Sequence, residues 1–358
     1  MNRLLLFCFL MMLSFGGIKA QDIHFTMFDM SPLSLNPAYA GAYKGTARIG
    51  GIYRDQWASF LRNQFTTTTF FVDAPIIRGF RKEDWVGVGM VTINDQAGSS
   101  RLRTSANFLT ASYHLALDKA RKNVLTLGIQ GGSMSRRLDD LSLDFGSEYD
   151  PNYRDPDGTI GGFNRGVATP GSAFQPEQAI SREPSSLTIN AGLLLRMKLE
   201  DGQEADIGVA VGNVNQPELN FLGAAGGGSN NNDDGRPMRI TVNGRYRTML
   251  TEKVSLTPSV LFQTQKGTNE IAAQALAGYQ IKENIELLAG PSFRLGDAFA
   301  LMAGAQYDDL RVGLAYDFNI SSLNQASNTL GGFELAAYYV IKLYKKPNVK
   351  PALLCPEF

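Results

Sequence analysis

The strongest constraint on the fold is an alternation of large apolar side chains with charged or small ones, which recurs through most of the chain. The clearest example is residues 310–318, LRVGLAYDF. A two-residue period places the large apolar side chains on one face of a β-strand and the others on the opposite face. Repeated over many segments behind an export signal, the pattern predicts a transmembrane antiparallel β-barrel of the bacterial outer membrane.

The first twenty residues have the form of a secretory signal peptide. Arg3 precedes an apolar run over residues 4–15, and Ala20 marks a plausible cleavage point. Cys8 lies in that run, so the mature chain keeps only Cys355 and no internal disulfide is possible. No later run of about 18 apolar residues occurs, which excludes an ordinary transmembrane helix. Without the leader the chain has 32 basic and 34 acidic residues, which gives no reason to expect nucleic acid as a partner.

The alternating segments predict about fourteen strands, an even number, as in single-chain bacterial barrels. They lie near 45–55, 65–75, 84–94, 102–117, 123–137, 186–199, 205–213, 238–249, 254–266, 270–281, 285–295, 298–307, 309–319 and 332–343. The chain is thus divided into a signal peptide (1–20), an N-terminal periplasmic or plug segment (21–44), the barrel (45–343) and a periplasmic C-terminal tail (344–358). A soluble β-sandwich or a solenoid, which also alternates, is the alternative fold.

The lengths of the connections between the predicted strands provide a check on this division. Five short connections fall at even-numbered turns: 118–122, 201–204, 250–253, 282–284 and 308–309. The three long ones, 138–185, 214–237 and 320–331, all fall at odd-numbered turns. Outer-membrane barrels pair short periplasmic turns with long outer loops. We therefore expect the outer face of the wall to contact outer-membrane lipid and the long loops to lie outside the cell.

The same alternation predicts which polar side chains face the lumen. On the strand 238–249, Met238, Ile240, Val242 and Tyr246 are expected to face lipid. The residues expected in the lumen are Arg239, Thr241, Asn243, Arg245 and Arg247, with Arg48, Arg103, Arg196, Arg294, Arg311, Asp317 and Glu334 from other strands. A barrel of this size has a lumen wider than side chains readily fill, so it is either a narrow channel or occupied by a plug.

The chain has few side chains arranged as catalysis requires. Ser112 and His114 share one face of a strand, but their Cα atoms are expected to be roughly 6–7 Å apart, and the nearest acidic residue, Asp118, is at the strand end. A nucleophile needs its base within hydrogen-bond distance and a third group to orient that base. We expect a hydrogen-bonded lumen histidine and no enzyme.

No metal or cofactor site is expected either. No Cys/His cluster has metal-ligand spacing. Segments 153–164 and 230–241 resemble calcium loops only faintly, because both lack the closing Glu and have Asn164 and Thr241 in its place. The glycine-rich run 223–229 is followed by no Lys-Ser/Thr pair, so it predicts a flexible loop tip and not a phosphate loop.

The segment 25–41, between the leader and the first strand, contains two prolines and several apolar side chains. It predicts an ordered coil that packs on something, and not a strand of the wall. Two positions are open to it. It lies against the periplasmic rim of the barrel, or it enters the lumen as a plug and meets the arginines there.

Several motifs resemble the PorP/SprF family, outer-membrane proteins associated with the type IX secretion system and with gliding motility in the Bacteroidetes. The most specific are NPAYAG at 36–41 and YRDQW at 53–57; further matches are GVAVGNVN at 208–215, VGLAYD at 312–317 and GFE at 332–334. The family-matched residues expected to have a plug or partner-docking role are Asn36, Pro37, Tyr39, Gly41, Arg54, Gln56 and Trp57.

The resemblance implies an adaptor barrel that does not itself form the export conduit. Its expected partners are a secreted, adhesin-like cargo protein with a C-terminal sorting domain, and type IX or peptidoglycan-associated components in the periplasm. The rival hypotheses are a passive channel for small anionic or amphipathic solutes and, less in keeping with the residues present, a lipid-acting enzyme at His114.

Overall fold

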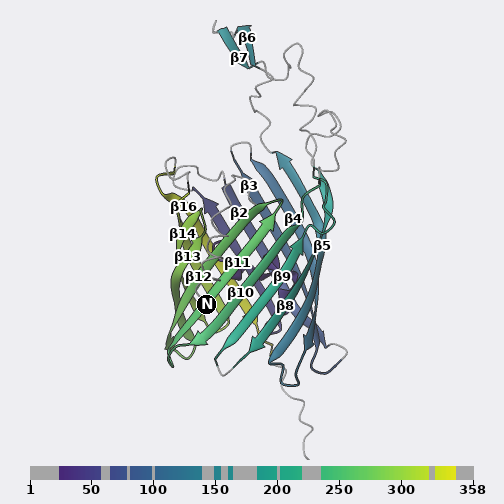
Figure 1. Cartoon of the computed structure of the whole chain (residues 1–358), viewed down its shortest axis with the longest axis vertical. Coiled ribbons are helices and arrows are strands. Elements are labelled where there is room, and N and C mark those ends of the chain that lie inside the picture. Colours follow the sequence, from purple (N-terminus) through teal and green to yellow (C-terminus); the bar gives the residue numbers. More distant parts are fainter. Residues whose placement is uncertain are drawn as a thin grey trace, which may run out of the picture.

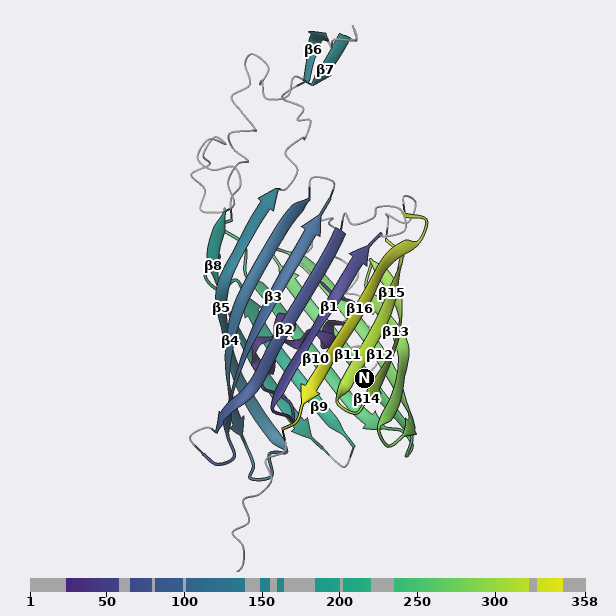
Figure 2. The ribbon, with the colours of Figure 1, turned by 180° about the vertical axis from the view of Figure 1, so that it is seen from behind.

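The computed structural model describes residues 24–57, 65–78, 81–98, 101–138, 149–154, 160–163, 184–199, 202–219, 235–321 and 327–343. Its main feature is a closed antiparallel barrel of fourteen strands (Figure 1), so the predicted fold class is confirmed. Neighbouring strands follow one another along the chain, except that β5 pairs with β8. The barrel closes where β16 pairs with β1, and Figure 2 shows these strands side by side.

The wall consists of fourteen strands whose ends differ from the predicted ones by no more than three residues. They are β1 (Ala47–Gln56), β2 (Phe65–Arg78), β3 (Trp85–Ala97), β4 (Leu102–Ala116), β5 (Asn123–Leu138), β8 (Ser185–Lys198), β9 (Glu204–Gly212), β10 (Arg239–Met249), β11 (Val254–Gln265), β12 (Thr268–Lys282), β13 (Ile285–Arg294), β14 (Ala298–Tyr307), β15 (Leu310–Asn319) and β16 (Leu330–Ile341).

Two further strands, β6 (Tyr149–Arg154) and β7 (Ile160–Phe163), form a small separate sheet in the connection after β5. The sequence pattern predicts one long connection over 138–185 and does not predict this pair. The physical reason is that Pro151 and the glycines of β7 interrupt any alternation of apolar and polar side chains.

The two ends of the barrel differ in their connections. β1 begins and β16 ends at one end, which we call the turn end; the opposite end, which we call the loop end, carries the connections after β1, β3, β5, β9, β11, β13 and β15. The two longest connections, 139–184 and 213–238, are both at the loop end.

Side chains alternate across the wall as a transmembrane barrel requires. On β14, Phe299 and Leu301 are exposed on the outer face, whereas Ala300 and Met302 are buried inside. Exposed aromatic side chains gather near both ends of the outer face: Phe293, Phe299, Phe318 and Phe333 near the loop end, and Tyr279, Tyr307 and Tyr339 near the turn end. Two such girdles are typical of barrels that cross the outer membrane. None of the described helices is long and apolar enough to span a membrane.

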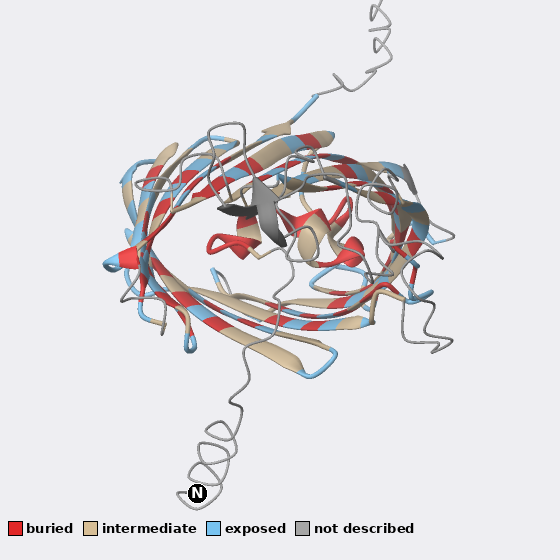
Figure 3. Ribbon diagram, turned by 90° about the horizontal axis from the view of Figure 1, so that it is seen from above, coloured by how far each residue is buried: buried red, intermediate tan, exposed pale blue. Residues whose placement is uncertain are grey.

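Residues 24–46 lie inside the barrel, and we call this segment the plug. It contains three short helical turns, η1 (Phe28–Met30), α2 (Pro32–Leu35) and η2 (Pro37–Tyr39), which Figure 3 shows largely buried within the ring of strands. Proline begins α2 and η2, where its missing N–H and fixed φ suit the first turn. The plug runs towards the turn end, where the Thr46 N–H donates to the Ile341 carbonyl over 2.7 Å.

Candidate functional site: the plugged lumen

A stripe of small residues on the inner wall lets the plug backbone approach the strands closely. The stripe crosses four adjacent strands in register: Gly87 (β3), Ser112 (β4), Gly128 (β5) and Gly192 (β8). A Cβ atom added at Gly87 would lie 2.2 Å from the Ala40 carbonyl oxygen, and one added at Gly128 would lie 2.4 Å from the Ala38 nitrogen. These distances leave no room for a Cβ atom at either position unless the plug moves away from the wall.

Asn36, which is fully buried, fixes the plug to β8 and β9. Its Nδ2 donates to the carbonyls of Leu193 and Val209 over 2.9 and 3.3 Å. Its Oδ1 accepts the Ala38 N–H over 2.9 Å and so caps η2. Every polar atom of this side chain is therefore used, as burial demands.

Gly41 reverses the direction of the chain in the part of the plug nearer the turn end, with a left-handed φ of 66°. Its N–H donates to Asp73 Oδ2 over 2.7 Å, and its carbonyl accepts from Trp85 Nε1 over 2.9 Å. Arg48 donates two hydrogen bonds to the same Asp73 carboxylate, each 2.9 Å long. The buried carboxylate is thus paired with a guanidinium and also holds the plug main chain.

A second charged network holds the plug towards the loop end. Glu334, which is fully buried, accepts the N–H groups of Thr26 and the next residue over 2.7 and 2.9 Å and forms an ion pair with Arg54. Asp317 accepts the Thr26 hydroxyl over 2.6 Å and pairs with Arg54 and Arg294, each at 3.0 Å. Two carboxylates face two guanidinium groups, so the buried charges are balanced.

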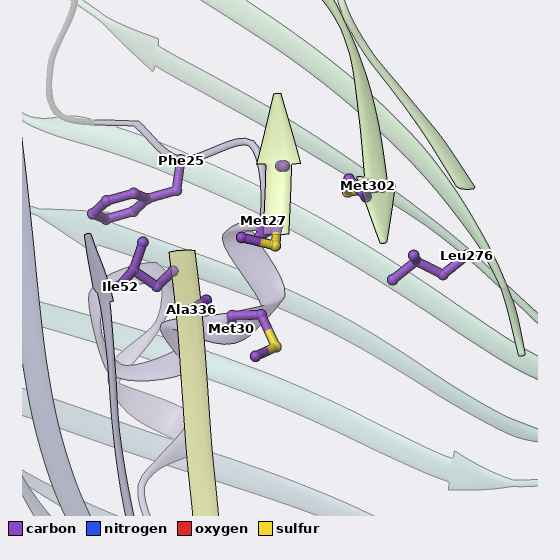
Figure 4. Close-up of a cluster of buried hydrophobic side chains, with 8 residues drawn as sticks. Phe25, Met27, Met30, Ile52, Leu276, Met302 and Ala336 are labelled. Carbon is purple, nitrogen blue, oxygen red and sulfur yellow. The ribbon is translucent and has the colours of Figure 1, made fainter. Parts of the chain in front are cut away.

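Apolar contacts surround this network. Figure 4 shows Phe25, Met27 and Met30 of the plug beside Ile52, Leu276, Met302 and Ala336 of the wall. Asp29 of η1 lies 3.3 Å from Arg311 of β15, which ties the same part of the plug to the wall by charge. The plug is therefore held by main-chain, ionic and apolar contacts together.

Ser112 and His114 also hold the plug. Ser112 Oγ lies 3.0 Å from His114 Nε2, but both atoms donate to the Ala40 carbonyl, over 2.6 and 2.8 Å. Since Nε2 carries a proton to do so, it cannot accept the serine proton as a general base. Nδ1 faces the Thr126 hydroxyl at 2.9 Å, where a catalytic triad would have a carboxylate, and Trp85 stacks on the ring at 4.5 Å. The pair is buried beneath the plug and anchors it.

The seven family-motif residues do not form one cluster. Four lie together in the lumen on the wall of β3 to β10: Asn36, Pro37, Tyr39 and Gly41. Arg54 is on β1 and contacts the plug at Thr26, with its Nη1 3.3 Å from the threonine hydroxyl. Gln56 ends β1 at the loop end, and the ring of Trp57, which follows it, packs against Phe65 with centroids 4.9 Å apart.

The prediction that Arg103 faces the lumen is wrong. On β4 the even-numbered side chains, from Thr104 to Ala116, are buried inside, so Arg103 is on the outer face of the wall. It is near the loop end of its strand, where a charge on the outer face is tolerated because it lies close to the membrane surface.

The other residues predicted to face the lumen line the inner wall, and most contact a charge or the plug. Asn243 donates to the Tyr39 hydroxyl over 2.7 Å, Arg245 pairs with Asp206, Arg247 with Glu286 at 3.2 Å, Arg311 with Asp29 and Asp317 with Arg54, while Arg239 lines a cavity of about 70 Å³ beside the plug. The signal peptide, the segments 155–158 and 223–234, and the tail 344–358 with Cys355 lie outside the described residues. Within the described ranges no group of three or more His, Cys, Asp or Glu could hold a metal ion.

Asp73 and Asp206, whose carboxylates pair with arginines of the lumen, are not among the residues predicted from the sequence to face it. Asp73 pairs with Arg48, and Asp206 pairs with Arg196 at 3.3 Å and with Arg245. Each is a lone charge between apolar neighbours in a strand, as in Val72-Asp73-Ala74. A charge in that position is tolerated only on the inner face, so this signal could have identified both.

Comparison with known proteins places the chain in a family. The family model described as type IX secretion system membrane protein PorP/SprF matches residues 18–339. No curated protein matches the chain. Solved structures similar to it include the Pseudomonas putida toluene transporter TodX, with a TM-score of 0.49, 11% identity and coverage of 87% of this chain and 94% of that one. Another is a Pseudomonas aeruginosa FadL homologue, with a TM-score of 0.43, 13% identity and coverage of 85% and 92%. Because the family model spans most of the sequence, this protein belongs to the PorP/SprF family of type IX secretion system membrane proteins.

Proposed function

We propose that this barrel is a non-enzymatic adaptor of the type IX secretion and gliding machinery in the outer membrane. It would support secretion or surface anchoring of an adhesin-like cargo with a C-terminal sorting domain by binding that cargo at the loop end. At the turn end it would contact periplasmic type IX or peptidoglycan-associated components. Family membership supports the assignment of the barrel to the type IX machinery. The plugged lumen supports its role as an adaptor.

The filled lumen is the observation that carries the proposal. Residues 24–46 pack against the inner wall through the glycine stripe, buried ion pairs and apolar side chains. A barrel filled in this way by its own chain is poorly suited to conduct a polypeptide. A rigid wall that fixes the spacing of long loops is, in contrast, well suited to binding.

The motif residues take different roles in this proposal. Asn36 and Gly41 hold the plug, as does Arg54 through Thr26. Gln56 and Trp57, at the loop end, are the motif residues placed where a cargo domain would approach.

An affinity pull-down from gently solubilised outer membranes, followed by mass spectrometry, tests the proposal. Recovery of a large surface protein with a C-terminal sorting domain, together with type IX components, is the expected result. A matched variant with residues 139–184 replaced by a short Gly-Ser turn should lose the cargo and keep the turn-end partners. A barrel recovered alone from wild-type membranes would contradict the adaptor role.

The second candidate function is a passive channel for small anionic or amphipathic solutes. The basic lumen favours it, because a cavity of about 340 Å³ lined by several arginines remains beside the plug. Conductance in planar bilayers distinguishes the two functions. The adaptor predicts a closed wild-type barrel and an open one after deletion of residues 25–41, whereas a channel predicts conductance in the wild type.

A further inference from the structure

The larger cavity of the lumen lies between the plug and the wall, towards the turn end. Its volume of about 340 Å³ is within the range of small-molecule sites. Lys198 and Glu204, at the turn-end termini of β8 and β9, line it with side chains that are 37% and 42% exposed. These half-exposed residues mark the mouth, so a solute would enter from the turn end.

Six basic side chains line this cavity: Lys44, Arg48, Arg196, Lys198, Arg245 and Arg311. The carboxylates that pair with them number four, because Asp206 serves both Arg196 and Arg245 while Asp29, Asp73 and Glu204 serve one cation each. No carboxylate of the described residues forms an ion pair with Lys44. The cluster therefore has an excess of two positive charges.

Hydroxyl groups complete the lining. Ser259 is 3% exposed, and its Oγ is buried without a hydrogen-bond partner although the residue lines the cavity. The Tyr39 hydroxyl accepts from Asn243, which leaves its own proton to donate elsewhere. A buried hydroxyl without a partner is unfavourable, and a ligand that accepts hydrogen bonds would satisfy it.

Guanidinium, ammonium and hydroxyl groups around one space are the donors that bind oxyanions. The excess of positive charge disfavours a metal cation, and the charged lining disfavours an apolar ligand. We propose that this cavity binds a small dianionic oxyanion, of the phosphate monoester or dicarboxylate class. Two negative charges would neutralise the excess, and the ligand would join Lys44 and Tyr39 of the plug to Arg196 and Arg245 of the wall.

Binding of a dianion in this cavity does not depend on cargo binding, but it does depend on the position of the plug. A ligand that contacts both plug and wall binds only while the plug is in place. By linkage it stabilises the plugged barrel against unfolding. Bound dianion should therefore raise the thermal transition of the purified protein.

The test uses the full mature barrel in a neutral detergent, with inorganic phosphate, glycerol 3-phosphate and succinate as probes and acetate as the monoanion control, at constant ionic strength. Calorimetric titration and the thermal transition are the readouts. At least one dianion should bind and raise the transition, and acetate should not. A response to the two phosphates alone identifies phosphate esters as the ligand class, and a response to succinate alone identifies dicarboxylates.

Lys44→Gln removes a cation without leaving a carboxylate unpaired, so it should weaken dianion binding about tenfold while the barrel still folds. Ser259→Ala should weaken it as well. Lys253→Gln, at an exposed turn of the same end but outside the cavity, is the matched control and should bind as the wild type does. The proposal is wrong if no dianion binds, or if Lys253→Gln weakens binding as much as Lys44→Gln does.

Discussion

Replacing Gly128 with alanine tests whether the plug depends on the stripe of small residues. The new Cβ would lie 2.4 Å from the Ala38 nitrogen and 2.5 Å from the Pro37 carbonyl carbon. These are main-chain atoms, so no side-chain rotation relieves the contact. The plug must move by about 1 Å to restore an ordinary separation of about 3.5 Å.

The size of the effect follows from two opposing terms. Overpacking a filled site destabilises by about 1–3 kcal/mol. Replacing glycine by alanine within a strand stabilises by roughly 0.5–1 kcal/mol, because glycine loses more backbone freedom on folding. We therefore expect Gly128→Ala to lower the free energy of unfolding by about 1–2 kcal/mol.

Gly131→Ala is the matched control on the same strand. A Cβ there has no atom within 4 Å, so only the stabilising term remains. The two variants should differ by about 2 kcal/mol in guanidinium unfolding of the detergent-solubilised barrel.

Tryptophan fluorescence follows this unfolding and also reports on the plug. Trp85, one of two tryptophans in the chain, donates a hydrogen bond to the Gly41 carbonyl. Its emission should change in Gly128→Ala before any denaturant is added. Equal unfolding free energies for both alanine variants, with unchanged emission, would refute the close approach of the plug to the stripe.

Three further predictions concern buried and turn-end polar groups. Arg54→Ala leaves two buried carboxylates with one cation fewer and should lower the free energy of unfolding by about 3 kcal/mol. Lys198→Ala, which removes a half-exposed ion pair, is the control and should lower it by less than about 1 kcal/mol in the same unfolding assay. Hydrogen bonds from Arg81 lower the pKa of Asp84 from 3.8 to about 2. The ionised carboxylate thus stabilises the fold above its unfolded pKa, and the difference in stability between wild type and Asp84→Asn should shrink as the pH falls from about 5 towards 2. His114→Gln should destabilise by about 1–2 kcal/mol through the Ala40 carbonyl, with no change in any lipid-modifying activity of the membrane.

The strands could be predicted because each one carries its own evidence. In a wall between lipid and a polar lumen, alternate side chains face the lipid and the lumen. The sequence of a single segment such as 310–318 therefore identifies its lipid face and its lumen face without information from neighbouring strands. β6 and β7 lack this evidence, since neither lies in such a wall. A local pattern therefore identifies the barrel strands and fails for the small sheet beyond them.

The path of the plug depends on contacts that no local pattern contains. Thr26 bonds to Glu334, 308 positions away in the chain, and to Asp317, 291 positions away. The prolines of 25–41 exclude a wall strand, but they do not distinguish a rim from a lumen. The partners of this segment become neighbours only after the barrel has closed.

The stripe of small residues shows what the sequence does contain about the plug. Gly87, Gly128 and Gly192 are on three strands, and only the strand register, through Ser112, brings them to one depth on the inner wall. Inner positions of a barrel this wide have room for large polar side chains, so an unbroken row of glycine and serine there is unusual. The row is explained by the close approach of another backbone, which leaves no space for larger side chains. Once register is assigned, a row of this kind predicts both that a lumen is occupied and which strands its occupant touches.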